Sequence, residues 1–376
     1  MKQLPLTFSL YIAKHFLLAI LVTLGIMLMI VGLMEMLELI RRTSDAPRAV
    51  PFLVILEMTF LKLPATAEKI YPFAFLMGGM VTLSRLTRSS ELVAARAAGV
   101  SVWQFMLPGV VLALLMGFVF ILIVNPVGSA MIARFEKVEG RYITGKPSVL
   151  SISPSGLWLR QVDSELPIDF LGQPVTEYIL HARRMDQSTL TLQDVILFFY
   201  DTKHRFVGRI DAATARLSSG AWEIQSAKLA VPGLVPETLD SYTMPTRLTL
   251  SQIQESFAAP ETLSFWELPA FIGVLEKAGF SALRHKLHWH ALFALPLLLA
   301  GMMLMAAVFS LRSARRGKTG ALIVLGIVVG FFYYFATQLI YALGASGALP
   351  IGLAAWAPSL VVLMLGTAAL LHLEDG

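Results

Sequence analysis

Long stretches without charged residues constrain this chain more than any other feature of its sequence. A helix that crosses the hydrocarbon core of a bilayer needs about 20 apolar residues. Because lipid offers no partners to backbone polar groups, such stretches fold as helices rather than as open strands. They predict five membrane spans, within residues 16–34, 102–124, 291–311, 320–343 and 349–371.

The stretch from Pro51 to Leu83 is expected to form a sixth span, although it contains charged residues and two prolines. Its apolar part, residues 70–83, is too short to cross alone, and the whole stretch as one helix would be roughly 50 Å long. We interpret it as one span, kinked at proline, whose first half tilts into the outer interface. Its charged side chains should then face a protein cavity rather than lipid: Glu57, Lys62, Glu68 and Lys69.

The region between the third and fourth spans has a different character. Aromatic and β-branched residues alternate with polar ones in GLWLRQV, EYILHARRM and TLQDVILFFYD, and turn residues separate these stretches. The pattern predicts an antiparallel β-domain, a sandwich or jellyroll, over residues 126–262. An amphipathic helix at the membrane interface is expected within residues 263–290, with Ser264 and Glu267 as a capping box. The fold class is therefore an α+β membrane protein: residues 1–125 hold spans one to three and residues 291–376 hold spans four to six.

The distribution of basic residues predicts the orientation of the chain. Arginine and lysine are concentrated in two short connections, residues 84–101 and residues 312–318. Because such an excess marks the cytoplasmic side, we expect both termini in the cytoplasm and the β-domain outside it. The formal net charge of +5 then reports orientation, and we expect no nucleic-acid partner. The sequence contains no cysteine, which excludes disulfides and thiolate catalysis.

Two motifs that suggest nucleotide or metal binding fit those functions poorly. The GKT of residues 317–319 lacks a glycine five residues earlier, where Arg312 stands, and it follows a span instead of a strand. His285 and His288 share a helical face, but no carboxylate lies at a matching spacing. We therefore expect no cofactor, no metal site and no catalytic residues.

Two patterns of small residues indicate close packing. In SSELVAARAAG, residues 89–99, a serine can cap a short helix that begins near Glu91, and Gly99 can end it in the left-handed conformation. Its alanines would let the groove of another protein approach the backbone, although an ordinary solvated helix is equally compatible with the pattern. The GIVVG of residues 326–330 favours close packing of the fifth span, and we favour a neighbour within the chain.

The sequence resembles the LptF/LptG permeases, which extract lipopolysaccharide from the bacterial inner membrane. The resemblance covers nearly the whole chain, and its most specific parts are LSRLTRSSELVAARAAGVSVWQF and the closing GALP…WAP region. YIAKHFL and SFWELPAFI are also similar to that family, and GLWLRQ and ELIRR are more similar to its G-type subunit.

This resemblance implies a multi-pass inner-membrane protein with six spans and a periplasmic β-jellyroll between the third and fourth. It implies a permease subunit of an ABC transporter, in which a separate LptB-type ATPase dimer hydrolyses ATP. The other implied partners are an F-type permease and a single-span LptC-type jellyroll protein. The implied substrate is lipopolysaccharide, which passes to a periplasmic bridge toward the outer membrane.

The resemblance also implies two sets of site residues. Glu91 would be the glutamate that couples the permease to the ATPase, on a coupling helix at about residues 89–99. Arg41 and Arg42 match basic positions thought to meet substrate phosphates. Glu35 stands where the family often has a lysine, and we expect it to lie deeper and balance the arginines. The remaining expected residues are Arg88, Leu92, Ala95 and Gly99 for coupling and Arg134 for substrate.

Two other functions remain open. One is the permease of another lipid or lipoprotein exporting ABC system, against which the number of spans and the place of the β-domain argue. The other is an intramembrane lipid-modifying enzyme, for which His285 is the best candidate base. Co-purification with an ATPase would distinguish a transporter from an enzyme.

Overall fold

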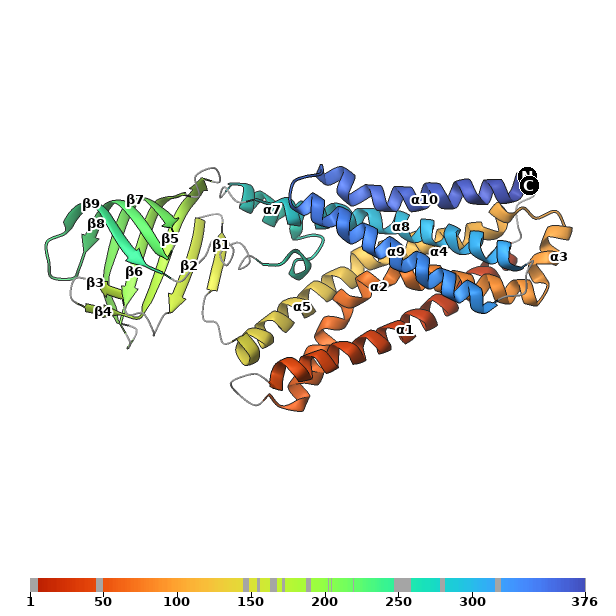
Figure 1. The fold of residues 1–376 in the computed structure, drawn as a ribbon, viewed down its shortest axis with the longest axis horizontal. Coiled ribbons are helices and arrows are strands. Elements are labelled where there is room, and N and C mark those ends of the chain that lie inside the picture. The colour runs from red at the N-terminus through yellow and green to blue at the C-terminus, as the bar shows by residue number, and fades with distance from the viewer. Residues whose placement is uncertain are drawn as a thin grey trace. The chain divides into compact units, whose positions relative to one another are not determined.

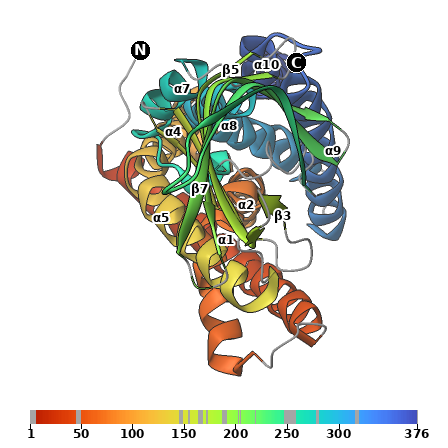
Figure 2. The same ribbon diagram turned by 90° about the vertical axis from the view of Figure 1, so that its left-hand side faces the viewer.

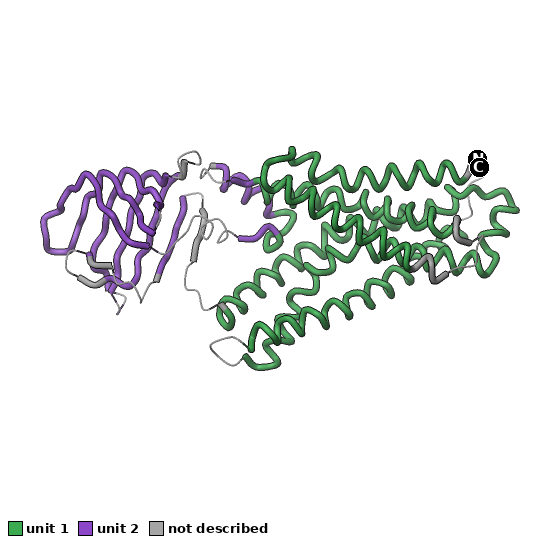
Figure 3. Tube along the Cα trace, viewed as in Figure 1, with its two compact units in different colours: residues 1–143, 261–266, 283–376 green, residues 144–260, 267–282 purple. Residues whose placement is uncertain are grey.

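The computed structural model describes residues 6–44, 50–144, 149–153, 156–162, 168–170, 173–186, 191–201, 203, 205–218, 220–246, 258–277, 281–314 and 319–375. The chain forms two compact units, coloured in Figure 3. The first, here called the helical unit, comprises residues 1–143, 261–266 and 283–376. The second, called the β unit, comprises residues 144–260 and 267–282.

The helical unit contains the five predicted apolar helices (Figure 1). Among the described residues, five helical segments are long and apolar enough to cross a membrane: Thr7–Ser44, Val102–Ile143, Leu283–Leu311, Val324–Ala345 and Ile351–Leu373. They correspond to α1 (Leu6–Ser44), α4 (Val102–Val119) with its continuation, α8 (Leu283–Ala314), α9 (Thr319–Ala345) and α10 (Ile351–Asp375).

The expected sixth segment is one unbroken helix, α2 (Phe52–Arg88), which contains Pro64 and Pro72. Among its charged residues, Glu57 and Lys62 form ion pairs with other helices and Glu68 lines a polar pocket, as expected. Lys69 is exposed.

The third apolar segment continues as a helix well beyond its predicted end. After α4 the backbone forms a π-helical turn, η1 (Phe120–Val124), followed by α5 (Asn125–Glu139) and a second π-helical turn, η2 (Gly140–Thr144). The expected start of the β-domain at residue 126 is therefore wrong. A proline lies in the first turn of α5, directly after the π-helical turn η1.

Helix α8 is the central helix of the unit and packs against α2, α4, α9 and α10. It begins at Leu283, eight residues before the predicted start of the fourth span at residue 291. The polar RHKLHWH stretch belongs to this helix, and His285 and His288 are buried. Glycines allow close contacts: a Cβ on Gly117 of α4 would lie 2.6 Å from Pro296 Cα of α8.

The GIVVG pattern packs within the chain, as predicted. A Cβ on Gly326 would lie 2.8 Å from the sulfur of Met77, and one on Gly330 would lie 2.6 Å from the Phe73 ring. Both neighbours belong to α2. The small residues of α9 therefore accommodate large side chains of α2.

The β unit confirms the prediction of an antiparallel β-domain (Figures 1 and 2). Its described strands form one seven-stranded sheet in the order β1-β2-β5-β6-β7-β8-β9 and a separate β3–β4 hairpin. Each strand of the large sheet pairs with the next, except that the hairpin is inserted between β2 and β5, so β1 and β9 are the edges. The strands are β1 (Val149–Ser153), β2 (Gly156–Val162), β3 (Ile168–Phe170), β4 (Gln173–Val175), β5 (Glu177–Asp186), β6 (Thr191–Tyr200), β7 (Phe206–Ser218), β8 (Ala221–Ala230) and β9 (Glu237–Pro245).

A row of irregular positions crosses this sheet at one level. Asp194 of β6 and Ser226 of β8 have positive φ angles of 53° and 54°. The regular pairing on both sides of the row is in register, yet no pair forms between Asp194 and Ala213 or between Ala213 and Ser226. Two consecutive residues of β6 and of β8 are exposed at this level, after which alternation resumes. Because neighbouring strands share the irregularity, one face of the sheet remains buried along its length.

Helix α7 (Leu268–Lys277) is the amphipathic helix of the β unit and contacts β1. Leu268, Ile272 and Leu275 are buried, as the periodicity predicts. Helix α7 begins four residues after Ser264, so Ser264 does not directly precede its first helical residue.

Candidate functional site

The short helix α3 (Glu91–Ala97) connects α2 to α4 at the end of the bundle that also holds the first turns of α1 and the last turns of α10 (Figure 1). Its C-terminus forms as predicted. Gly99 has a φ of +84°, its N–H donates to Arg96 O at 3.0 Å, and the Val100 N–H donates to Ala95 O at 3.0 Å. This pair of bonds is the Schellman motif, which fixes the end of the helix.

The N-terminus of α3 differs from the prediction of a serine cap. Ser90 has a φ of 59° and its side chain forms no cap hydrogen bond, so this part of the prediction is wrong. The Ser89 hydroxyl instead donates to Glu91 Oε1 at 2.8 Å. The Tyr11 side chain of α1 lies close to the Glu91 side chain. The half-buried carboxylate of Glu91 is therefore oriented by the Ser89 hydroxyl.

The expected coupling residues occupy different environments. Leu92 is buried, so it anchors α3 to the bundle. Ala95 is half-buried, and Arg88 and Gly99 are exposed. Small side chains predominate on the exposed face, which another protein can approach closely: Ala94, Ala97 and Ala98.

At the opposite end of the bundle, three ion pairs connect three helices. We call these pairs the ion-pair triangle. Glu35 of α1 pairs with Lys62 of α2. Arg42 Nη1 of α1 lies 2.9 Å from Glu139 Oε1 of α5, and Arg134 Nη2 of α5 lies 2.5 Å from Glu57 Oε1 of α2. Each helix is thus joined to each of the other two by one pair.

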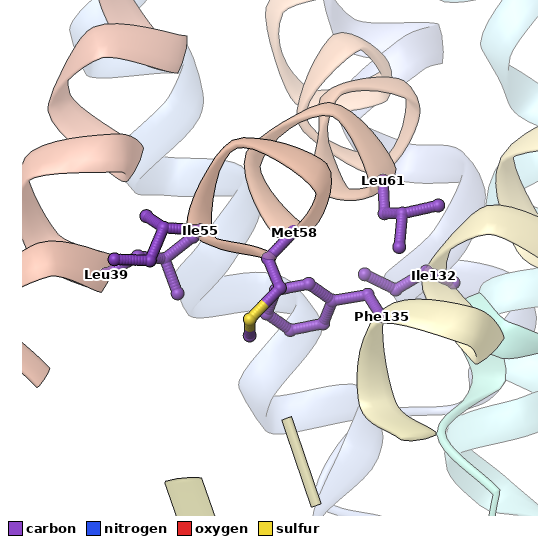
Figure 4. Close-up of a cluster of buried hydrophobic side chains, with 6 residues drawn as sticks. All are labelled: Leu39, Ile55, Met58, Leu61, Ile132 and Phe135. Carbon is purple, nitrogen blue, oxygen red and sulfur yellow. The ribbon is translucent and has the colours of Figure 1, made fainter. Parts of the chain in front are cut away.

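An apolar cluster connects the same three helices (Figure 4). The ammonium group of Lys62 lies 5.5 Å from the centre of the Phe135 ring, at the edge of this cluster, in a cation–π contact. The charged pairs therefore accompany a packed apolar contact. The cluster consists of Leu39, Ile55, Met58, Leu61, Ile132 and Phe135.

The predicted substrate residues are divided between paired and exposed positions. Arg42 and Arg134 each pair with a carboxylate on another helix. Arg41 is 80% exposed, and its Nε lies 3.5 Å from Glu38 Oε2 of the same helix. Glu35 pairs with Lys62, so the expectation that it balances the arginines is wrong.

Sequence reasoning identified these partners only in part. Glu57 and Lys62 were recognisable as charges that require protein partners, but the sequence does not say which ones. Glu139 was missed because the helix that carries it was predicted to end near residue 125. Its signal is that Glu136 and Glu139 follow an apolar segment at helical spacing.

A small polar pocket lies within the helical unit, lined in part by Glu68, Ser129 and Glu261. Asn125 Oδ1, also in its lining, accepts a hydrogen bond from the Phe265 N–H at 2.8 Å. In the part of the chain that the structure describes, no group of three or more histidines and carboxylates has the arrangement of a metal site. His285 is buried, which argues against its use as a base that acts on a lipid.

Comparison with known proteins gives a consistent result. The family model described as lipopolysaccharide export system permease LptF/LptG matches residues 10–372. A Haemophilus influenzae protein named lipopolysaccharide export system permease protein LptG is 26% identical over 369 residues, which cover 96% of each chain. The protein of the same name from Escherichia coli K12 is 26% identical over 347 residues, which cover 88% of each chain.

Proposed function

The chain belongs to the LptF/LptG family of lipopolysaccharide export system permeases, and we propose from this premise that it is the G-type subunit of an ABC transporter. Lipopolysaccharide export is the function of the family, and the match over residues 10–372 is the single observation that carries it. This match favours lipopolysaccharide export over lipoprotein export and over the activity of an intramembrane enzyme. The subunit works with an F-type permease, an LptB-type ATPase dimer and an LptC-type protein.

In the proposed topology α2 is the sixth span, both termini and α3 lie in the cytoplasm, and the β unit lies in the periplasm. The concentration of arginines in residues 84–101 supports this orientation. The second basic connection includes residues 315–318, which lie outside the described residues. The seven-stranded sheet serves as the jellyroll of the family and, on leaving the membrane, the lipid passes along it to the periplasmic bridge.

For coupling, we propose that α3 docks against the ATPase and that Glu91 pairs with a basic residue there. The exposed alanines allow close approach, and the Schellman motif keeps α3 short and fixed between two long helices. Ser89 holds the carboxylate in place before docking. Leu92 positions α3 from within the bundle.

For the substrate, we propose that Arg41, Arg42 and Arg134 bind phosphates of lipopolysaccharide. Their side chains are 80%, 44% and 67% exposed, so an incoming headgroup can reach all three. Arginine suits this role because its planar guanidinium group binds phosphate through two parallel hydrogen bonds.

The test is reconstitution of the four partners in proteoliposomes that contain lipopolysaccharide, with a photo-crosslinker in α1 to report substrate capture and a second in the LptC-type protein to report export. We expect ATP-dependent crosslinking at the second position. Replacement of both Arg42 and Arg134 by alanine should reduce crosslinking in α1, whereas Arg209→Ala with Arg216→Ala in the β unit is a matched control that should leave capture unchanged. Absence of ATP-dependent transfer in an assembled complex would contradict the transport function.

A further inference from the structure

We propose that Glu57 and Glu139 are temporary partners of Arg134 and Arg42, and that an anionic lipid headgroup displaces both carboxylates and so loosens α5 from α1 and α2. This inference rests on the proposed function and deepens it. It assigns two carboxylates a role in substrate capture: each keeps one arginine oriented and neutralised until a phosphate replaces it.

The geometry of both pairs permits exchange. The closest contacts are 2.9 Å between Arg42 Nη1 and Glu139 Oε1 and 2.5 Å between Arg134 Nη2 and Glu57 Oε1. A phosphate can bind the guanidinium fork through two parallel hydrogen bonds. Because exposed ion pairs contribute little to stability, a phosphate bound in this way can displace the carboxylate.

The exposure of the paired groups favours approach by an external anion. Arg42 is 44% exposed and its partner Glu139 is 21% exposed. Arg134 is 67% exposed and its partner Glu57 is 40% exposed. An anion that approaches from outside the bundle therefore meets the guanidinium groups first, and the released carboxylates remain accessible to water.

The third pair of the ion-pair triangle differs and should not exchange. Lys62 and Glu35 are 31% and 22% exposed, and Lys62 also lies against the Phe135 ring. Both pairs proposed to exchange include a residue of α5, whereas this one joins α1 to α2. Headgroup binding should therefore free α5 while α1 and α2 remain joined.

The backbone of α5 provides a place where such a movement can begin. The π-helical turn η1 (Phe120–Val124) directly precedes α5. Such turns interrupt the regular hydrogen bonding of an α-helix and commonly occur at functional positions. Because Ile132 and Phe135 belong to the apolar cluster, release of the pairs should tilt α5 rather than detach it.

The absence of cysteine from the natural sequence allows a direct test by double electron–electron resonance. Leu37 of α1 and Lys137 of α5 are both exposed, so Leu37→Cys and Lys137→Cys provide spin-label sites. In the complete complex in nanodiscs, we expect saturating lipopolysaccharide to lengthen or broaden the distance distribution. Glu57→Gln with Glu139→Gln should give a similar distribution without lipid and bind lipopolysaccharide about two- to fivefold more tightly for each carboxylate removed.

Glu38→Gln is the matched control, because Glu38 pairs with Arg41 of the same helix and joins no helices. It should leave the distance distribution unchanged. If lipopolysaccharide binds to the natural pairs without altering the distribution, the arginines bind phosphate while retaining their carboxylates and the exchange is wrong, although the export function stands. If Arg42→Ala with Arg134→Ala leaves binding undiminished, the arginine site itself is wrong. Should the glutamine variants fail to assemble, the labelled chain with its natural ion pairs still decides the question.

Discussion

At the residue scale, charged side chains in an apolar bundle depend on partners supplied by other helices. Glu35 and Lys62 lie in long apolar helices, and each is less than one-third exposed. An unpaired charge in such a place loses hydration without compensation. The pair therefore explains how α1 and α2 carry charges close to the membrane.

Lys62→Met should leave Glu35 unpaired and lower the free energy of unfolding by about 1.5–3 kcal/mol, the range for hydrogen bonds to charged groups. Lys69→Met is the matched control, since this lysine of the same helix is exposed. It should change stability by about 0.5 kcal/mol or less. Exchange of the two residues, Glu35→Lys with Lys62→Glu, should recover most of the loss. Denaturant unfolding in detergent measures the free energy of unfolding of the two lysine variants and of the exchanged pair. Equal effects of the two lysine substitutions would refute the pairing.

Glu91→Ala should weaken association with the ATPase while the chain inserts normally. Loss of one member of a charged hydrogen-bonded pair costs about 1.5–3 kcal/mol, which is roughly a ten- to hundredfold loss of affinity. The measurements are co-purification with the LptB-type ATPase and the ratio of lipopolysaccharide transported to ATP hydrolysed. Glu223→Ala, an exposed carboxylate of β8, is the control. A Glu91→Ala complex that assembles and transports normally would show that Glu91 has no coupling role.

At the scale of elements, glycines determine how closely the helices approach. Gly117 of α4 lies against the backbone of Pro296 in α8, where a Cβ has no room. Gly128 of α5 similarly faces Pro64 of α2. At both contacts a glycine leaves room for a proline of the neighbouring helix.

Gly117→Ala should destabilise the helical unit by about 1–3 kcal/mol through overpacking. Its new Cβ would lie 2.6 Å from Pro296 Cα, so backbone rather than a flexible side chain must move. Gly25→Ala in α1 is the matched control, because no atom lies within 4 Å of the added methyl group. That change should be neutral or stabilise the helix by up to about 1 kcal/mol. Thermal unfolding in detergent compares them, and equal stability of the two variants would show that the close contact is unimportant.

At the scale of the whole molecule, the edges of the large sheet determine where another protein can add a strand. In the described sheet β2 and β5 to β8 are interior, and β3 and β4 form a separate hairpin. The edges are β1 and β9, and β9 is exposed along most of its length. An exposed edge offers unpaired backbone groups to a partner strand.

Photo-crosslinkers placed along β1 and β9 should capture a periplasmic partner from at least one edge, with a repeat of two residues because alternate side chains point to opposite faces. Crosslinkers at outward-facing positions of β6, such as Gln193, provide the control within the interior of the sheet. The expected partner is the LptC-type protein, identified by mass spectrometry. If crosslinkers at the edges of a functioning complex capture a partner no more often than crosslinkers in β6, strand addition is ruled out.

The sequence alone determined the features that depend on local chemistry. Apolar stretches of about 20 residues have no stable alternative to helices in lipid, so five helices were predictable. The C-terminal end of α3 was predictable because Gly99 adopts a left-handed conformation that most residues avoid. Alternation with a period of two identified the β-domain, and the motifs around α3 identified the family.

Only the tertiary structure decided which distant residues meet. Glu35 and Lys62 are 27 residues apart, and Glu57 and Arg134 are 77 apart, so no local periodicity connects them. The continuation of α4 through η1 into α5 depends on packing against α2, which stabilises a helix beyond the apolar stretch. Likewise, the irregular row at Asp194 is shared by neighbouring strands, and a strand considered alone does not reveal it. Local sequence fixes backbone preference, whereas partners and register depend on the simultaneous packing of segments that are far apart in the chain.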